Sequence, residues 1–384
     1  MSRILQIICM AFFVVTAGVA QDQVPVFDSK ANYAILIDAK SGNVFYEKNA
    51  DVSVPPASMS KLVTQAIVFD ALKAGTLTEN QELLVSEDAW RRGGSPAGGS
   101  TMYAELNSRV RVIDLLRGAI IQSANDACIV FAEALSGSEP AFLGAMDKKA
   151  KDLGLANSTF GNSTGLPDPN HKMSVRDLAT VARYIVTEHP TYFKLYGEPE
   201  FTWNKISQSN RNPLLKEFPG ADGMKTGYTR EAGYGLVGTA TRDGRRLIMV
   251  VAGMETPSAR REEAQKLLDF GFRQFKAVDV FEKGEVVATA RVWGGDKRWV
   301  DLVTVESFGI ALSAKEQETV EVKLSYNGPL IAPVKQGAQI GSVRLIVEGK
   351  VVAETNVITA GSVEPITSMW YKALDSLLIM VFGG

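Results

Sequence analysis

The spacing of apolar and polar residues over 21–276 predicts an alternation of strands and helices. Residues 33–48 read as two strands rich in Val, Ile, Phe and Tyr, joined by a turn at 41–43. Apolar residues recur at helical spacing over about 58–74, and Gly75 is suited to end that helix. The same reasoning predicts further helices at 112–122, 123–137, 174–188 and 258–275, and one hairpin at 232–254. This order favours an α/β (α+β) domain in which helices cover a mostly antiparallel sheet.

The pattern changes near residue 277, where short β-rich runs replace the helices. Runs such as VDLVTVE and TVEVKLSY are separated by turn residues, for example at 294–296 and 327–328. Strands of this length and spacing are typical of a β-sandwich. We therefore expect a first domain over 21–276 and a separate small β-sandwich domain over 277–362.

Residues 363–384 form a tail whose polar and apolar residues separate onto two faces of one helix. Lys372, Asp375 and Ser376 occupy one face. The other face carries an apolar series, Ile366, Met369, Trp370, Ala373, Leu374, Leu377 and Leu378. Charged residues in mid-helix argue against a membrane span, so we expect an amphipathic helix that lies in the membrane interface. The alternative is a helix that packs on the β domain or on a second copy of the chain.

The first twenty residues have the pattern of a signal peptide. Arg3 precedes an apolar run over 4–15, and small residues at 17–20 supply a cleavage site. An uncleaved anchor helix fits less well, because the apolar run is shorter than the roughly 20 residues that span a bilayer. We therefore predict an exported protein. After cleavage Cys128 is its remaining cysteine, which excludes an internal disulfide.

Composition narrows the chemistry that the chain can support. Apolar residues make up 46% and charged residues 22%, as in ordinary globular proteins. The formal net charge is −2, so the chain lacks the overall positive charge that is typical of nucleic-acid-binding proteins. The two histidines, His171 and His189, and the two cysteines offer too few ligands for a zinc cluster. We therefore expect a protein that uses no metal and no other cofactor.

Three short motifs indicate where chemistry takes place. In chain order they are Ser58-x-x-Lys61, Ser123-Ala-Asn125 and Lys225-Thr226-Gly227. Each is a weak signal alone, because a serine at a helix start is often only an N-cap. The first two stand at predicted helix starts and the third in a predicted strand. That combination of order and context indicates one shared site.

Lys61 is the candidate base for a serine nucleophile at Ser58. A serine hydroxyl attacks poorly at neutral pH unless a base accepts its proton. Lys61 shares a helical face with Ser58 at i, i+3, but it must first lose its own proton. Burial, the positive end of its helix and Lys225 as a neighbouring cation would each lower the pKa of Lys61. A Ser-His-Asp triad that uses His171 or His189 is the alternative.

The second and third motifs can serve the remaining steps of an acyl transfer. Ser123 can relay a proton to the leaving amine, and the Asn125 amide can hold Lys61 and a substrate carbonyl at once. Lys225 and Thr226 are expected on an edge strand that can pair with an extended peptide.

Gly227 and its neighbour complete the predicted site. A glycine in the strand leaves room for the substrate backbone to come close. The oxyanion that forms during acyl transfer needs two donors. We expect these to be the backbone amides of Ser58, at a helix start, and Tyr228, which follows the glycine.

Residues 28–382 resemble the low-molecular-mass penicillin-binding proteins that act as D-alanyl-D-alanine carboxypeptidases. The three motifs are the set that penicillin-binding proteins and serine β-lactamases carry. The segments FGNSTGLPDPNH (160–171) and DGMKTGYT (222–229) are similar as well. So is the layout of signal, catalytic domain, β domain and amphipathic tail. Tyr228 stands where some members of the family carry a histidine.

The resemblance implies a serine peptidase of bacterial peptidoglycan that works through an acyl-enzyme on Ser58. The terminal D-alanine of a stem pentapeptide would leave, water would release the shortened peptide, and β-lactam antibiotics would acylate the same serine. Lys225, Thr226 and Arg211 would bind the free carboxylate of the substrate. The exported protein would lie peripherally on the periplasmic face of the inner membrane, held by its tail.

Three other functions share parts of this pattern. An endopeptidase that cuts peptidoglycan crosslinks would carry the same motifs. So would a β-lactamase, but its commonest type deacylates with a glutamate between the second and third motifs, where 160–171 offers Asp168 and no glutamate. Loss of Ser58, Lys61 or Lys225 would have favoured a non-catalytic wall-binding scaffold, and all three are present.

Overall fold

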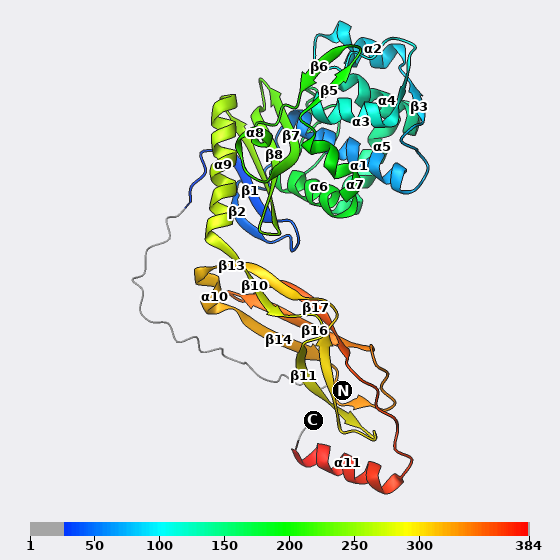
Figure 1. Ribbon diagram of the computed structural model, residues 1–384, viewed down its shortest axis with the longest axis vertical. Coiled ribbons are helices and arrows are strands. Elements are labelled where there is room, and N and C mark those ends of the chain that lie inside the picture. Colours follow the sequence, from blue (N-terminus) through cyan, green and yellow to red (C-terminus); the bar gives the residue numbers. More distant parts are fainter. Residues whose placement is uncertain (1–26, 383–384) are drawn as a thin grey trace. The chain divides into compact units, whose positions relative to one another are not determined.

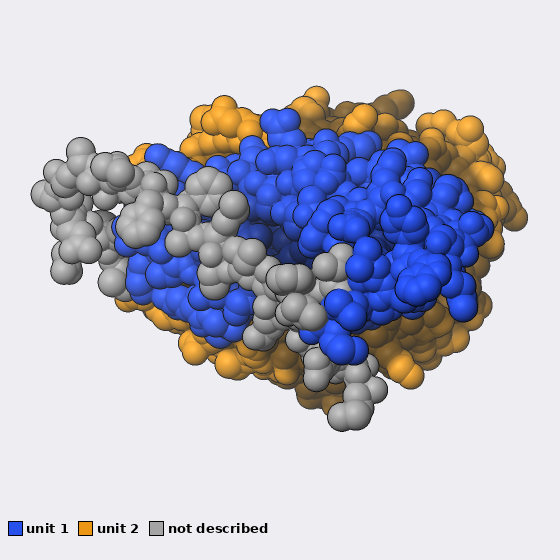
Figure 2. Space-filling view, turned by 90° about the horizontal axis from the view of Figure 1, so that it is seen from below, with its two compact units in different colours: residues 1–24, 274–384 blue, residues 25–273 orange. Residues whose placement is uncertain are grey.

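The structure, a computed structural model, describes residues 27–382, so the predicted signal peptide at 1–20 lies outside the described residues. The chain divides into two compact units between Arg273 and Gln274. Figure 1 traces the elements, and Figure 2 colours the larger unit (25–273) orange and the smaller unit blue. Each unit buries a hydrophobic core of its own.

A five-stranded antiparallel sheet forms the centre of the larger unit, in the order β2-β1-β9-β8-β7. The strands are β1 (Tyr33–Asp38), β2 (Val44–Lys48), β7 (Ala221–Thr229), β8 (Gly233–Arg242) and β9 (Arg245–Met254). The predicted hairpin is β8–β9, and both residues of its turn, Asp243 and Gly244, have the positive φ that a tight hairpin requires. β7 lies at the edge of the sheet.

Helices cover both faces of this sheet (Figure 1). The helices of this unit are α1 (Lys61–Lys73), α2 (Glu87–Gly93), α3 (Val112–Ile121), α4 (Asn125–Ser136), α5 (Glu139–Leu153), α6 (Val175–Glu188), α7 (Pro190–Phe193), α8 (Leu214–Glu217) and α9 (Pro257–Gln274). α9 packs Ala264, Leu267 and Leu268 against one face of the sheet. α1, α4 and α6 bury the other face in the larger core. The predicted arrangement of helices over an antiparallel sheet is confirmed.

Two helix starts differ from the predictions, and both carry candidate site residues. Ser58 lies in a 3₁₀ turn, η1 (Ala57–Ser60), and α1 begins only at Lys61. Ser123 precedes α4, whose cap position is taken by Ala124. The two serine side chains therefore do not cap helices.

In the larger unit, several short elements and four helices were not predicted. The short elements are η2 (Ser95–Ala97), η3 (Lys194–Gly197), β3 (Glu82–Leu84), β4 (Arg109–Arg111), β5 (Glu200–Trp203) and β6 (Ile206–Ser209). The helices are α2, α5, α7 and α8, and both α2 and α5 begin with a serine cap. Ser86 accepts from the Ala89 amide and Ser138 from the Ala141 amide.

The smaller unit has two sheets around one core. Its six-stranded sheet has the order β14-β16-β17-β12-β11-β15, and β10 pairs with β13. The elements are β10 (Phe275–Phe281), β11 (Val286–Trp293), β12 (Trp299–Thr304), β13 (Phe308–Ser313), α10 (Ala314–Thr319), β14 (Glu321–Tyr326), β15 (Leu330–Ile331), β16 (Gln339–Val347), β17 (Lys350–Thr359) and α11 (Met369–Phe382). Val292 and Leu302 of the larger sheet share the core with Ile310 of β13, as in a sandwich.

Within the smaller unit, α11 packs its polar face on the end of β11. Asp375 is buried, forms an ion pair with Arg291 and accepts a hydrogen bond from the Gly294 amide at 3.0 Å. Trp293 Nε1 donates to Ser376 Oγ at 3.0 Å. Exposed apolar side chains remain along the helix, namely Met369, Trp370, Leu374, Leu377 and Met380. None of the helices within 27–382 is both long enough and apolar enough to cross a bilayer.

Candidate active site

The predicted site residues meet at a cavity of about 260 Å³ in the larger unit. The cavity is lined by Ser58, Ser100, Ser123, Arg211, Thr226, Gly227, Tyr228 and Arg260. The remaining predicted residues, Lys61, Asn125 and Lys225, are buried and hydrogen-bonded within the same cluster. The fold thus brings together η1 with α1, the start of α4, and the edge strand β7.

Lys61 lies at the centre of a buried hydrogen-bond cluster. Its Nζ is 3.0 Å from Ser58 Oγ and donates to Asn125 Oδ1 at 2.8 Å. It also donates to the backbone carbonyl of Thr164, in the loop 160–171. Because the Lys61 side chain is fully buried, these protein groups replace the water that would otherwise solvate the amine.

Burial lowers the pKa of Lys61 from 10.5 to about 8. Cys128, Asp126 and Glu139 oppose this shift, whereas the positive charge of Arg211 adds to it. The sequence predicted Lys225 as the neighbouring cation. Lys225 lies close enough for the charge of Lys61 to lower its pKa, and Arg211 is a further cation that acts on Lys61. Near neutral pH a usable fraction of the amine is therefore unprotonated and can accept a proton.

Lys225 faces Ser123. Its Nζ donates to Ser123 Oγ at 2.9 Å and to the Thr226 carbonyl at 3.2 Å. Burial, with the charges of Lys61 and Arg211, holds the pKa of Lys225 well below its usual value. Ser123 has a φ of +62°, which is strained for a serine, and such backbone strain is common where a side chain must be aimed at a reaction.

Gly227 lets the edge strand approach the turn that carries Ser58. A Cβ atom at this position would lie 3.0 Å from both the Pro56 carbonyl oxygen and Met59 Cγ. The glycine therefore lets β7 pack closely on η1, and the room that it leaves for a substrate backbone stays a prediction. A side chain at 227 would require Met59 or the turn at 56–57 to shift.

Two arginines face the cavity without a carboxylate partner. Arg211 Nη1 donates to Ser100 Oγ at 2.6 Å, and burial lowers the pKa of Arg211. Arg260, on α9, has its guanidinium 5.8 Å from the centroid of the Tyr234 ring, and burial lowers its pKa as well. Among the described residues neither arginine pairs with Asp or Glu. The cavity is therefore suited to an anionic group of a ligand.

Sequence reasoning missed Arg260, Ser100 and the Thr164 carbonyl. Arg260 stands beside Arg261 in a polar helix, and no sequence signal separates them, although Arg261 pairs with Glu217 at 3.3 Å on the surface. Ser100 belongs to the Gly-rich stretch 91–101, whose residue types do not mark it as part of a site. Thr164 contributes a backbone atom, for which its residue type gives no signal.

Neither histidine lies at the cavity. His171 Nδ1 accepts from the Gly161 amide at 3.1 Å, and His189 Nε2 lies 3.0 Å from Asp70 Oδ1. Burial lowers the pKa of His171 to about 4, so this side chain is neutral at physiological pH. The alternative of a Ser-His-Asp triad at Ser58 is therefore excluded.

A larger hollow of about 680 Å³ lies elsewhere on the larger unit, lined in part by Phe193, Asp222 and Arg246. Three of its charged groups are engaged in ion pairs, since Arg246 bonds to Asp222 at 2.6 Å and Glu198 to Arg117 at 2.9 Å. None of the predicted residues lines it, so the smaller cavity is the better candidate despite its size.

Comparison with known proteins assigns the family. A family model described as D-alanyl-D-alanine carboxypeptidase matches residues 18–256. The chain belongs to the D-alanyl-D-alanine carboxypeptidase family. A second model, described as penicillin-binding protein 5, C-terminal domain, matches residues 275–365. The prediction of a serine peptidase of the D-alanyl-D-alanine carboxypeptidase family is thereby confirmed.

Relatives of this carboxypeptidase align along nearly its whole length. It is 38% identical over 356 residues to the D-alanyl-D-alanine carboxypeptidase DacC of Escherichia coli, across 92% of this chain and 89% of the relative. With DacA of Haemophilus influenzae the identity is 37%, across 91% of this chain and 89% of the relative. Both units are therefore shared with these relatives.

Solved structures of the family have the same fold. Penicillin binding protein 5 from Haemophilus influenzae superposes with a TM-score of 0.78 at 37% identity, across 88% of this chain and 98% of that one. Penicillin-Binding Protein D2 from Listeria monocytogenes, solved in an ampicillin-bound form, gives 0.58 at 31% identity, across 65% of this chain and all of that one (100%). The predicted fold class is confirmed by both.

Proposed function

We propose that Ser58 is the nucleophile of this carboxypeptidase and that Lys61 is its base. The observation that carries the proposal is the 3.0 Å separation of Lys61 Nζ and Ser58 Oγ, in a buried cluster where the pKa of the amine is about 8. A neutral amine at this distance can take the hydroxyl proton as the oxygen attacks. Asn125 fixes the amine in that position through its side-chain oxygen.

The proposed substrate is a peptidoglycan stem pentapeptide that ends in D-Ala-D-Ala. Ser58 Oγ adds to the carbonyl carbon between the two D-alanines while Lys61 takes its proton. The amides of Ser58 and Tyr228 stabilise the oxyanion. The C–N bond then breaks as Ser123, held by Lys225, passes its proton to the leaving amine and regains one from the Lys61 ammonium. Water attacks the ester while Lys61 takes one of its protons. The shortened peptide leaves, and Lys61 returns that proton to Ser58 Oγ.

The carboxylate of the last D-alanine is proposed to bind where the unpaired arginines meet the edge strand. Arg211 and Arg260 supply positive charge, and the Thr226 hydroxyl and Lys225 lie beside them on β7. A carboxylate held by two cations forms charge-assisted hydrogen bonds, which are stronger than neutral ones. The same contacts would hold the carboxylate of a β-lactam while it acylates Ser58.

Covalent labelling tests the proposed nucleophile. A fluorescent penicillin should attach to Ser58, and mass spectrometry of the labelled peptide should find the added mass on that residue alone. Incubation with a pentapeptide and with a crosslinked dimer then shows which bond is cleaved. An adduct on another residue, or none, would reject the mechanism. Release of product from the dimer alone would make the enzyme an endopeptidase.

Replacing Arg211 by glutamine should weaken binding of the substrate carboxylate. We expect kcat/KM for a D-Ala-D-Ala peptide to fall about ten- to a hundredfold, because a charged hydrogen bond contributes about 1.5–3 kcal/mol. The same peptide with an amidated C-terminus should be a poor substrate for both proteins and should show little further loss in the variant. Arg261→Gln, which alters a surface pair, is the control and should behave as wild type.

We further propose that the protein is exported and lies peripherally on the periplasmic face of the inner membrane. α11 turns its polar side to the sheets of the smaller unit, where Asp375 is buried, and leaves Trp370, Leu374 and Leu377 exposed. An amphipathic helix in water normally buries its apolar side. The reverse arrangement suits a helix whose apolar side enters lipid headgroups and acyl chains.

A further inference from the structure

The loop 160–171 supplies one of the three hydrogen-bond partners of Lys61, the Thr164 carbonyl. The loop lies directly against the turn that carries Ser58. A Cβ atom on Gly165 would be 2.1 Å from the Ala57 carbonyl oxygen, so backbone packs on backbone there. The position of the lysine amine therefore depends on how firmly this loop is held.

Glu139, the first residue of α5, holds the loop through the residue that precedes Thr164. One of its oxygens accepts from the Ser163 amide at 2.9 Å and from Ser163 Oγ at 2.6 Å. The Ser163 carbonyl in turn accepts from Thr64 Oγ1 on α1 at 2.8 Å. The residue before Thr164 is thus fixed on both sides, by α5 and by the helix that begins with Lys61.

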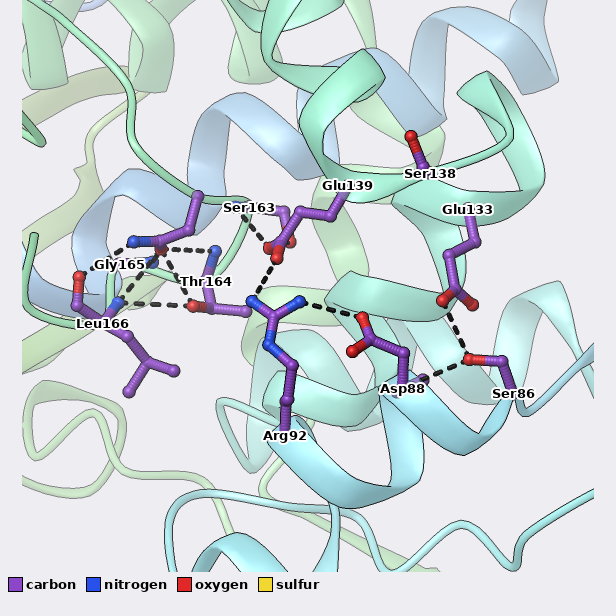
Figure 3. Close-up of polar contacts among 12 residues, drawn as sticks. Ser86, Asp88, Arg92, Glu133, Ser138, Glu139, Ser163, Thr164, Gly165 and Leu166 are labelled. Carbon is purple, nitrogen blue, oxygen red and sulfur yellow. Dashed lines mark hydrogen bonds and ion pairs between the residues drawn. The ribbon is translucent and has the colours of Figure 1, made fainter.

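The environment of Glu139 is not that of an ordinary helix-start acid. An acidic residue in the first turn stabilises a helix while remaining in solvent. Glu139 is 5% exposed and has a salt bridge to Arg92 Nη2 at 2.6 Å, and Arg92 also pairs with Asp88 at 2.8 Å. Figure 3 shows the glutamate between Arg92 and Ser163. Burying a carboxylate costs free energy that a cap alone does not require.

We propose that Glu139 is a positioning residue, which holds the Thr164 carbonyl against Lys61 through Ser163 and is neutralised by Arg92. The proposal rests on Lys61 as the base for Ser58. Glu139 touches neither substrate nor reacting atoms. Its effect on acylation is transmitted by the loop and by its negative charge.

The charge of Glu139 also affects the pH at which the Lys61 amine becomes neutral. Among the charged and titratable groups that act on Lys61, Glu139 and the α4 residues Asp126 and Cys128 raise its pKa, and Arg211 lowers it. The charge of Lys61 in turn lowers the pKa of both Lys225 and His171. Removal of the Glu139 charge therefore lowers the pKa of Lys61 and extends its neutral form to lower pH.

Glu139→Gln tests the proposal in the full-length chain. Acylation by a fluorescent penicillin should rise with pH as Lys61 loses its proton and then reach a plateau. In the variant we expect the plateau to fall about tenfold, because a neutral amide loses the ion pair with Arg92 and its weaker hydrogen bonds to Ser163 hold the loop less firmly. The rising limb should move to lower pH. Loss of stability alone would lower the melting temperature without moving that limb.

Glu133→Gln is the matched control. Glu133 is a partly buried carboxylate of the same polar region and accepts from Ser86 Oγ at 2.8 Å, but it bonds to α2 and not to the loop (Figure 3). In Glu133→Gln the plateau rate should stay within twofold of wild type, and the rising limb should stay at the same pH. Equal changes in both variants would overturn the proposal, as would an unchanged plateau and limb in folded Glu139→Gln.

Arg92→Gln provides a test with the opposite sign. Because it leaves the buried Glu139 carboxylate without its partner, a thermal melt must first show that the variant is folded. It leaves the Glu139 charge uncompensated, so the limb should move to higher pH while the plateau is retained. A limb that does not move would contradict the proposed neutralisation by Arg92. If wild type is labelled at Ser58 and these variants show no effect, the positioning role fails and the proposed function stands.

Discussion

Replacing Lys61 by methionine is expected to slow the acylation of Ser58 by about a thousandfold or more, since loss of a general base commonly costs about 10² to 10⁴ in rate. Methionine has nearly the length of lysine and no charge, so it fits the buried position while removing the amine. The melting temperature should hold or rise, because a buried amine is costly to desolvate. Labelling kinetics with a fluorescent penicillin and a thermal melt measure the two effects.

The pH dependence of acylation in the wild-type enzyme also tests whether Lys61 is the base, without a mutation. Burial lowers the pKa of Lys61 to about 8, and the protonated form cannot accept a proton. Acylation should therefore fall about tenfold per pH unit below that value. Lys73→Met, an exposed lysine at the end of the same helix, is the control and should leave rate and profile unchanged. A Lys61→Met enzyme with normal turnover would refute the assignment of the base.

Replacing Trp370, Leu374 and Leu377 by glutamine should release the protein from membranes. Burial of each apolar side chain contributes about 1.5–3 kcal/mol, so the triple variant should bind vesicles at least a hundredfold more weakly. Co-sedimentation with vesicles of phosphatidylethanolamine and phosphatidylglycerol measures this. Cleavage of a soluble D-Ala-D-Ala peptide should be unaffected, because the larger unit carries the cavity.

A matched control uses exposed valines on the same unit. Val286 and Val351 are 51% and 53% exposed, close to the 50% of Leu374, but they lie outside α11. Their replacement by glutamine should leave vesicle binding intact. Equal loss in both variants would indicate general surface effects, and retention of the α11 variant on vesicles would contradict the anchor. These substitutions leave Asp375 in place, so Arg291 keeps its buried partner.

Helices and turns could be predicted from the sequence where their own residues determine their conformation. α6 follows its periodicity, and Ser174 caps it by accepting from the Asp177 amide. The turn of the β8–β9 hairpin likewise follows from Asp243–Gly244. The 3₁₀ turn at Ser58 was not predictable in this way, because it depends on close packing against Gly227, far along the chain.

The same distinction applies to the site. Residues grouped in motifs were found from the sequence, since the motif itself marks them. Arg260 and Glu139 were missed because each resembles its surroundings, the first an arginine beside an arginine and the second an ordinary helix-start acid. What distinguishes them is an unpaired guanidinium at the cavity and a carboxylate turned inward, and both are set by tertiary packing.

The close fit at Gly227 bears on which positions of β7 accept a substitution. A side chain there requires Met59 or the turn at 56–57 to shift. The next position is different, because the Tyr228 side chain is 54% exposed and stacks on Tyr234 with ring centroids 4.1 Å apart. A substitution at 228 therefore changes the rim of the cavity without disturbing the packing of β7 on η1, whereas one at 227 disturbs that packing directly.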